Sequence, residues 1–231
     1  MTSLKFFTII VGGGLGIRFG GDVPKLLQEV GGRTILEWSI LSVYRSSCEK
    51  IVLVAPETYL AQFFEIAHRT PGEKIFDVVA GGKTRTESVR AGLESLSKIC
   101  RDDDIVAIHD GARPLASPKL FNLCAEAAAS YGAAIAAIPL TDTIKIVDED
   151  VIVETPRREK FWRAQTPQAF KFKIIAEALK GDAEFTDDAA AVEALGQKVH
   201  IVMGEHKNFK ITFPEDIHIA RAFLSIDADE K

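Results

Sequence analysis

Two basic side chains, Arg18 and Lys25, lie inside a glycine-rich segment near the N-terminus, which reads GGGLGIRFGGDVPK over residues 12–25. Backbone amides of such a loop can surround the oxygens of a triphosphate. Fixed cations then stabilise the charge that develops on these oxygens during phosphoryl or nucleotidyl transfer. The segment therefore predicts a loop that binds phosphates and also promotes their reaction, rather than a loop with two solvated surface cations.

Other kinds of nucleotide loop fit this segment less well. Gly14, Gly16 and Gly20 have the spacing G-x-G-x-x-x-G, which is one residue longer than the dinucleotide fingerprint. That fingerprint also needs an acidic residue at the end of the second strand, where the sequence instead reads LVAPETY. No Gly-Lys-Ser/Thr follows the glycines, so a P-loop is excluded as well. An NAD(P) dehydrogenase is therefore an alternative with little support.

A second glycine segment, AGGKTRTESVRAG, covers residues 80–92. Gly81 and Gly82 lack side-chain bulk, which would let the backbone approach a planar base closely. Ser88, one turn into the helix expected here, could then hydrogen-bond to the edge of that base. A plain turn followed by an ordinary helix start explains the same residues equally well.

A third segment, IHDGARP, covers residues 108–114. Asp110 is placed to bind Mg²⁺, an ion that prefers one or two carboxylates together with phosphate oxygens and water. We expect His109 to be a packed or hydrogen-bonded histidine at a strand end rather than a base. Arg113 either steers a phosphate or pairs with a nearby acid.

Six short apolar runs predict the strands that position these loops. Continuous apolar runs suit strands covered on both faces, and the longer amphipathic segments between them suit helices, so we expect a doubly wound α/β fold with a mostly parallel sheet. Ligands bind beyond the carboxyl ends of such strands, which brings the three loops to one crevice. The predicted strands are 6–11, 51–55, 75–80, 105–110, 133–138 and 198–203.

Residues 142–170 break the alternation of strands and helices. The β-type runs TIKIV and VIVET are joined by the acidic turn DED, which predicts a β-hairpin. A two-stranded arm is marginal alone in water, so we expect it to pack on a partner subunit and the chain to form a homodimer. We therefore expect one domain over residues 1–231, with a β-arm at about 141–165.

Two later segments have ordinary structural interpretations. Thr186, with Asp187 and Asp188 after it, is typical of a helix cap. Lys210 is typical of a charged residue that protects an edge strand.

Composition limits the possible partners and location. The chain has 231 residues and a net charge of −5, which argues against binding of nucleic acid or anionic lipid through a large basic surface. The apolar run at the N-terminus is too short for a signal peptide or a membrane span. The three cysteines lack metal-ligand spacing and indicate a reducing compartment, so we expect a cytoplasmic protein.

Taken in order, a set of segments resembles the 2-C-methyl-D-erythritol 4-phosphate cytidylyltransferase family of the non-mevalonate isoprenoid pathway. The resemblance runs from about residue 6 to residue 224, and WRAQTPQAF is its most specific part. The other segments are GGGLGIRF with PK after it, GGKTRTESV, HDGARP, DTIK, FTDDAAAV and NFKIT with PED after it.

This resemblance implies a reaction and a set of roles. The phosphate of 2-C-methyl-D-erythritol 4-phosphate would attack the α-phosphorus of CTP in line, with release of pyrophosphate and with a divalent cation, Mg²⁺, as cofactor. It implies that Arg18 and Lys25 stabilise the transition state and that Arg158 and Lys210 position the substrate phosphate. It further implies that the arm carries Arg158 to the neighbouring subunit's site, with the choice between Arg157 and Arg158 open. The implied CTP-binding residues are Gly12, Gly13, Gly14, Gly16, Gly82, Lys83, Ser88 and Asp110, of which Asp110 also binds the metal, and Thr143 and Thr186 would lie near the erythritol.

Two alternatives stay open beside this assignment. The ribitol 5-phosphate cytidylyltransferases share the same loops, although WRAQTPQ favours the erythritol enzyme. A nucleotide-binding module that has lost catalysis is the other alternative, and the presence of Arg18, Lys25, Asp110 and Lys210 argues against it.

Overall fold

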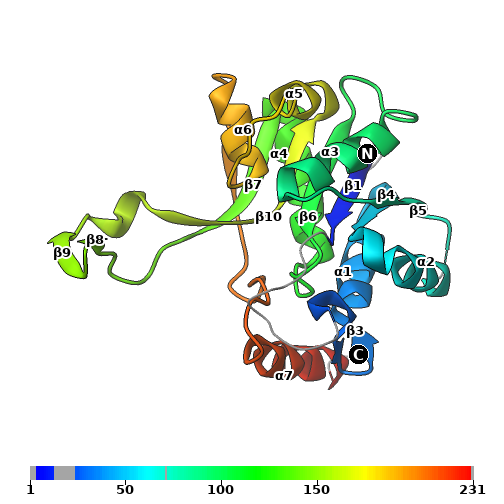
Figure 1. Ribbon diagram of the computed structural model, residues 1–231, viewed down its shortest axis with the longest axis horizontal. Coiled ribbons are helices and arrows are strands. Elements are labelled where there is room, and N and C mark those ends of the chain that lie inside the picture. Colours follow the sequence, from blue (N-terminus) through cyan, green and yellow to red (C-terminus); the bar gives the residue numbers. More distant parts are fainter. Residues whose placement is uncertain (1–3, 13–23, 71, 230–231) are drawn as a thin grey trace.

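A seven-stranded sheet forms the centre of the computed structural model, which describes residues 4–12, 24–70 and 72–229, the last of them (225–229) as backbone only (Figure 1). The strands lie in the order β11-β7-β10-β6-β1-β4-β5. All are parallel except β10, which runs antiparallel to both of its neighbours. The strands are β1 (Phe6–Val11), β4 (Cys48–Ala55), β5 (Ile75–Ala80), β6 (Ile105–Asp110), β7 (Ala133–Pro139), β10 (Trp162–Lys171) and β11 (His200–Met203).

Helices cover both faces of this sheet, as the continuous apolar runs predict. Along β1, Ile10 belongs to the core under one face, whereas Ile9 and Val11 belong to the core under the other. The predicted doubly wound α/β fold is therefore confirmed. Helices α1 (Ile35–Tyr44), α2 (Leu60–Arg69) and α4 (Pro118–Tyr131) pack on the Ile10 side, and α3 (Arg85–Leu96), α5 (Phe172–Ala178) and α6 (Asp188–Ala194) pack on the opposite side.

The remaining elements are short or peripheral. The C-terminal helix α7 (Asp216–Asp229) lies beyond the carboxyl ends of the strands, near β3 in Figure 1, and its Ala220 joins the core on the Ile10 side. No helix within the described ranges combines the length and apolar character that crossing a bilayer requires. The short elements are η1 (Lys25–Leu27), β2 (Glu29–Val30), β3 (Arg33–Thr34), η2 (Glu57–Tyr59) and η3 (Arg158–Lys160).

Six of the seven sheet strands coincide with predicted apolar runs, whereas β10 was not predicted. We expected residues 162–170 to belong to the hairpin segment, but they pair with β7 on one side and β6 on the other. The pairing with β7 shifts register between Ala164 and Gln168. Because Gln165, Thr166, Pro167 and Gln168 interrupt its apolar residues, this central strand has no continuous apolar run.

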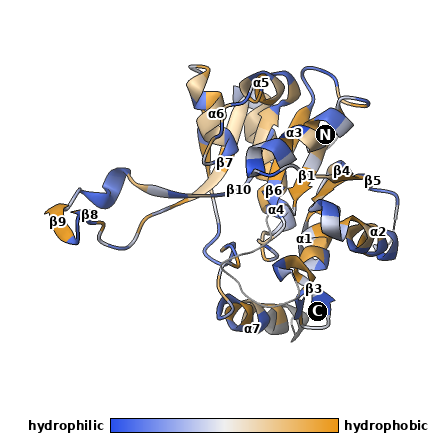
Figure 2. Cartoon of the chain, in the orientation of Figure 1, coloured by the Kyte–Doolittle hydropathy of each residue, from blue (hydrophilic) through white to orange (hydrophobic). Residues whose placement is uncertain are grey.

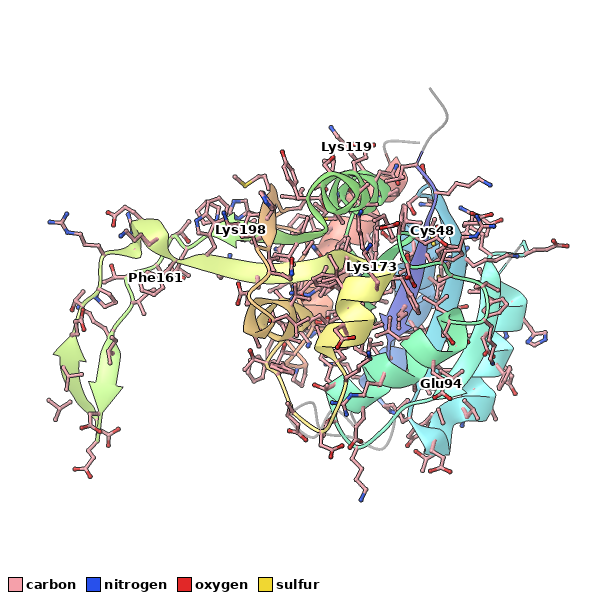
Figure 3. The ribbon with its side chains drawn as sticks, turned by 90° about the horizontal axis from the view of Figure 1, so that it is seen from above. Cys48, Glu94, Lys119, Phe161, Lys173 and Lys198 are labelled. Atoms are coloured by element: carbon pink, nitrogen blue, oxygen red, sulfur yellow. The ribbon has the colours of Figure 1, made fainter. Side chains whose placement is uncertain are left out.

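The predicted hairpin is present as β8 (Ile146–Asp148) and β9 (Val151–Glu154), and it projects from the body of the molecule (Figures 1 and 3). Glu149 and Asp150 both have positive φ, of 41° and 67°, as a two-residue type I′ turn requires. The arm is shorter than predicted at its C-terminal end, because Trp162 already pairs with Pro139 in the central sheet. Figure 2 shows apolar residues at the far end of the arm as well as in the central strands.

Candidate functional site

The site lies at the carboxyl end of β6, beside residues 164–168 of β10, and β1 is the neighbour of β6 on its other side. Gly12 directly follows β1, Asp110 ends β6, and the amide of Gly111 donates to the Val11 carbonyl at 3.0 Å. A pocket of about 330 Å³ opens here. It brings together the predicted residues Asp110, Thr186 and Lys210, and its full lining is Arg85, Asp110, Arg113, Ala164, Gln165, Thr166, Gln168, Thr186, Asp187 and Lys210.

Three cations surround the carboxylate of Asp110. Arg85 Nε lies 3.2 Å from Oδ1, and Lys210 Nζ and Arg113 Nε lie 3.0 Å and 3.5 Å from Oδ2. Burial raises the pKa of Asp110, but the attraction of Arg85, Lys210 and Arg113 outweighs burial and holds that pKa far below its ordinary range. Asp110 is therefore ionised in the folded protein, and Arg113 pairs with an acid, one of the two roles expected for it.

Arg85 connects Asp110 to a second buried carboxylate, and it is not among the residues predicted from the sequence. Its Nη1 and Nη2 donate to the two oxygens of Asp188 at 2.9 Å and 2.7 Å, while its Nε donates to Asp110. Burial lowers the pKa of Arg85, but Asp188 and Asp110 raise it above its ordinary value, so the guanidinium is charged. The only signal in the sequence is its position three residues after Gly82, at the start of a helix that faces the crevice.

His109 has the structural role expected of it. Its ring is fully buried and packs edge-on against Phe121, and burial lowers its pKa to about 4. Since the Arg113 carbonyl can only accept, His109 Nε2–H donates to it, and Nδ1 accepts from the hydroxyl of Thr166. The same hydroxyl oxygen accepts from the backbone amide of Asp110 at 3.0 Å. Thr166 thus ties the missed strand β10 to the end of β6.

The structural interpretation of Lys210 is wrong, because it lies in a loop after β11 and contacts Asp110 rather than protecting a strand edge. The side chain of Gln165 holds the start of this loop by donating to the Glu205 carbonyl at 2.8 Å. The side-chain amide of Asn208 donates to the Thr166 carbonyl at 2.8 Å. The backbone carbonyl of Asn208 accepts from Arg113 Nη1 at 2.9 Å. A network from β10 therefore positions the loop that carries Lys210.

The second glycine segment is closed onto helix α3 by a capping box. Thr84 accepts from the Glu87 amide at 3.1 Å, and Glu87 accepts from the amides of Thr84 and Lys83. Ser88 is fully buried and donates to the Thr84 carbonyl at 2.9 Å. A Cβ on Gly81 would lie 2.6 Å from the Ser88 hydroxyl and one on Gly82 would lie 2.3 Å from Glu87 Cβ, so packing alone already requires both glycines.

Other predicted residues lie away from this pocket or outside the described residues. A Cβ on Gly12 would lie 2.5 Å from the Phe63 ring and 2.8 Å from the Val54 carbonyl, so this glycine is required where β1 ends. Lys25 begins η1. Thr143 and Arg158 are exposed near the base of the arm, where Arg158 donates to the Thr141 carbonyl. Gly13, Gly14, Gly16 and Arg18 lie outside the residues that the structure describes.

The helix cap expected at residues 186–188 is confirmed, and its acids are already engaged. Asp187 is the N-cap of α6 and accepts from the Ala190 amide at 2.9 Å and from Gln168. Asp188 is paired with Arg85. Thr186, just before the cap, is exposed and faces the pocket.

A divalent metal fits poorly at Asp110. Both of its oxygens face cations, and displacing Lys210 would still leave Arg85 and Arg113 within 3.5 Å of them. Within the described residues, no group of three or more histidine, cysteine, aspartate or glutamate side chains is arranged to hold a metal ion. The arrangement suits an anion near Lys210 better than a cation on Asp110.

Comparisons with known proteins agree with this architecture. The family model described as "IspD: 2-C-methyl-D-erythritol 4-phosphate cytidylyltransferase" matches residues 6–226. The proteins of that name from Trichormus variabilis and Microcystis aeruginosa are 40% and 43% identical to the chain, and each alignment covers 95% of it and 97% and 98% of those relatives. The crystal structure of 4-diphosphocytidyl-2C-methyl-D-erythritol synthase from Anaerococcus prevotii is 33% identical, with a TM-score of 0.78 over 96% of both chains. The chain therefore belongs to the 2-C-methyl-D-erythritol 4-phosphate cytidylyltransferase family.

Proposed function

We propose that the chain transfers the cytidylyl group of CTP to 2-C-methyl-D-erythritol 4-phosphate and releases pyrophosphate. The observation that supports this most directly is the pocket at the carboxyl end of β6, where Lys210 and Arg113 converge on Asp110 and Arg85 of the second glycine segment lines the wall. An exposed ammonium group held in place by a buried carboxylate is a suitable receptor for a phosphate monoester. The family to which the chain belongs supplies the identity of the acceptor.

In the proposed reaction the acceptor phosphate oxygen attacks the α-phosphorus of CTP. The bond between the α-phosphorus and the oxygen that bridges it to the β-phosphorus breaks, and that oxygen leaves as part of pyrophosphate. Phosphoryl transfer of this kind depends on alignment and on fixed positive charge more than on an acid or a base. Arg18 and Lys25 would stabilise charge on the triphosphate, and Lys210 would hold the acceptor phosphate. His109 takes no part, because its neutral ring is committed to Thr166 and Arg113.

The remaining predicted residues complete the proposed site. Backbone groups of the first glycine segment and of Gly82 and Lys83, with Ser88 beneath them, would contact the cytidine, and Thr186 would lie beside the erythritol chain. The first segment contributes Gly12, Gly13, Gly14 and Gly16.

We propose that the divalent ion, Mg²⁺, reaches the site bound to the phosphate oxygens of CTP. When bound, it would neutralise charge on the triphosphate. Asp110 is occupied by three cations, so its proposed task is to position them.

We further propose a homodimer in which the arm brings Arg158 and Thr143 to the partner's site. The support is the arm's apolar surface: Ile146, Val147, Val151, Ile152 and Val153 are each about half exposed or more, with exposures from 46% to 64%. Figure 3 shows the arm, with Phe161 at its base, directed away from the body of its own subunit, so the body does not cover it. A hairpin with this surface is stabilised when a second copy covers it.

We keep the cytoplasm as the proposed location. The three cysteines, Cys48, Cys100 and Cys124, are unpaired, which suits its reducing conditions.

Pyrophosphate release from CTP and Mg²⁺ tests the reaction, with the two polyol phosphates as alternative acceptors. Faster turnover with 2-C-methyl-D-erythritol 4-phosphate is the expected result. Faster turnover with ribitol 5-phosphate would overturn the acceptor assignment, and tight CTP binding without turnover would indicate a non-catalytic module.

Mixing two inactive variants tests the shared site. Lys25→Ala and Arg158→Ala subunits are mixed under conditions that allow exchange. If Arg158 serves the partner, each mixed dimer contains one intact site, and random pairing restores about a quarter of wild-type activity. If Arg158 serves its own subunit, mixing restores nothing.

A further inference from the structure

We propose that Arg85 is a positioning residue for the transfer reaction. It fixes the carboxylate of Asp110, and through Asp110 it fixes the ammonium group of Lys210. This inference rests on the proposed function, because that function assigns Lys210 to the acceptor phosphate.

The orientation of Arg85 is set by Asp188. Two parallel hydrogen bonds, from Nη1 at 2.9 Å and from Nη2 at 2.7 Å, join the guanidinium to one carboxylate. Such a bidentate pair fixes the plane of the guanidinium as well as its distance. The side chain of Asp188 is only 2% exposed, so its own position is constrained by packing. The remaining Nε–H is therefore directed at one place, Oδ1 of Asp110.

Holding Oδ1 determines where Oδ2 lies. With Arg85 on Oδ1, Oδ2 is presented to Lys210 Nζ at 3.0 Å and to Arg113 Nε at 3.5 Å. Lysine is a flexible chain that ends in a point charge, and the side chain of Lys210 is 43% exposed. Its ionic contact with Oδ2 of Asp110 therefore defines where the ammonium group stands. Without Arg85, Asp110 can rotate and Lys210 loses its fixed partner.

The alternative is that Arg85 merely joins α3 to the C-terminal half of the chain. Arg90, on the same helix, does this by donating to the carbonyls of Leu179 at 2.7 Å and Ala183 at 3.1 Å. It is not among the residues that line the pocket, and no ionic contact joins it to Asp110. Arg90→Gln is thus a matched control. It removes an arginine of the same helix that, like Arg85, donates hydrogen bonds to two residues outside that helix.

The test is a kinetic cycle with CTP, Mg²⁺ and 2-C-methyl-D-erythritol 4-phosphate. The proteins are the wild type, Arg85→Gln, Lys210→Gln, the double variant and Arg90→Gln. We expect Arg85→Gln to lower kcat/KM for the acceptor roughly tenfold, the scale of a weakened charged hydrogen bond, and to change KM for CTP by less than about twofold. In the Lys210→Gln background the same substitution should change kcat/KM by less than about twofold, because it acts through Lys210. Arg90→Gln should leave both parameters near wild type.

Two results would overturn the inference: independent, multiplicative effects of Arg85→Gln and Lys210→Gln, or an equal loss of acceptor kcat/KM in Arg90→Gln. If Arg85→Gln does not fold, as judged by circular dichroism and Tm, Asp188→Asn replaces it. That variant keeps Arg85 but weakens its anchor, and it should show a smaller loss of the same kind that again disappears without Lys210. A wild type that does not use the acceptor would refute the proposed function itself, which is a different outcome.

Discussion

Replacing Asp110 by asparagine should destabilise the protein strongly and in a pH-dependent way. The carboxylate side chain is 11% exposed and lies within 3.5 Å of three cations. Asparagine keeps the shape but removes the charge, which leaves Arg85, Arg113 and Lys210 facing one another. Removing one partner from a buried ionic cluster costs about 3–5 kcal/mol, and we take about 3 kcal/mol because Arg85 retains Asp188. For a chain of this size that corresponds to a fall in Tm of about 6–12 °C.

The sign of the pH dependence follows from the depressed pKa of Asp110. Its folded pKa lies far below the value of about 3.9 in an unfolded chain, so the unfolded state takes up the proton first as pH falls. The stabilisation is therefore fully present above about pH 5 and is lost progressively below about pH 4. The difference in Tm between the wild type and Asp110→Asn should be largest near neutral pH and should shrink in acid.

Thermal melts followed by circular dichroism over this pH range measure the effect, and Asp103→Asn is the matched control. Asp103 also pairs with two cations, Lys171 at 3.2 Å and Lys173 at 3.0 Å, but its side chain is 69% exposed. Solvent screening makes such pairs weak, so Tm should hardly change in Asp103→Asn. Equal shifts in the two variants, or a shift for Asp110→Asn that is the same at every pH, would refute the reasoning.

Three further predictions concern residues around the pocket. Lys25→Ala should lower kcat by about 10²–10³-fold with little change in KM for CTP, as loss of a transition-state contact does; near wild-type kcat in steady-state assays would contradict that role. Thr166→Val keeps the side-chain shape but removes the partner of the Asp110 amide and of His109, so urea unfolding should show a loss of about 1–3 kcal/mol, and an unchanged midpoint would contradict the network. The pKa of His109 is about 4 when folded, so NMR should show it neutral near pH 6; its protonation in the unfolded chain should remove stability as pH falls from about 6.5 to about 4.

The sequence allowed most of the sheet to be predicted because the parallel strands are covered on both faces. Their apolar side chains alternate between two cores, as Ile9 and Ile10 of β1 do, so each strand appears as an unbroken apolar run. The arm was predictable for a local reason, since a short turn joins two β-type runs. Strand β10 had neither signal. Its polar residues Gln165, Thr166 and Gln168 are buried, and their hydrogen-bond partners come from distant segments.

The pocket residues found by sequence analysis are those that stand at strand ends or in recognisable segments, such as Asp110, Thr186 and Lys210. Arg85 could not be found in this way, because its meaning depends on Asp188, which follows it by 103 positions. An arginine in the first turn of a helix has no distinguishing pattern. Only the tertiary structure, which brings Asp110 and Asp188 to Arg85, shows that this side chain joins two buried carboxylates.

The role of Asp110 shows why the chemistry of a pocket depends on such distant contacts. Seen alone at the end of a strand, a carboxylate predicts a bound cation, and Mg²⁺ beside a triphosphate is the natural choice. The fold instead brings Arg85 from α3, Arg113 from the following loop and Lys210 from beyond β11 to that carboxylate. One negative charge then holds several positive charges in place, and the exposed one, Lys210, is presented to the pocket. We therefore propose that a residue type that predicts a cation site here supports an anion site, because tertiary structure decides the number of cations around it.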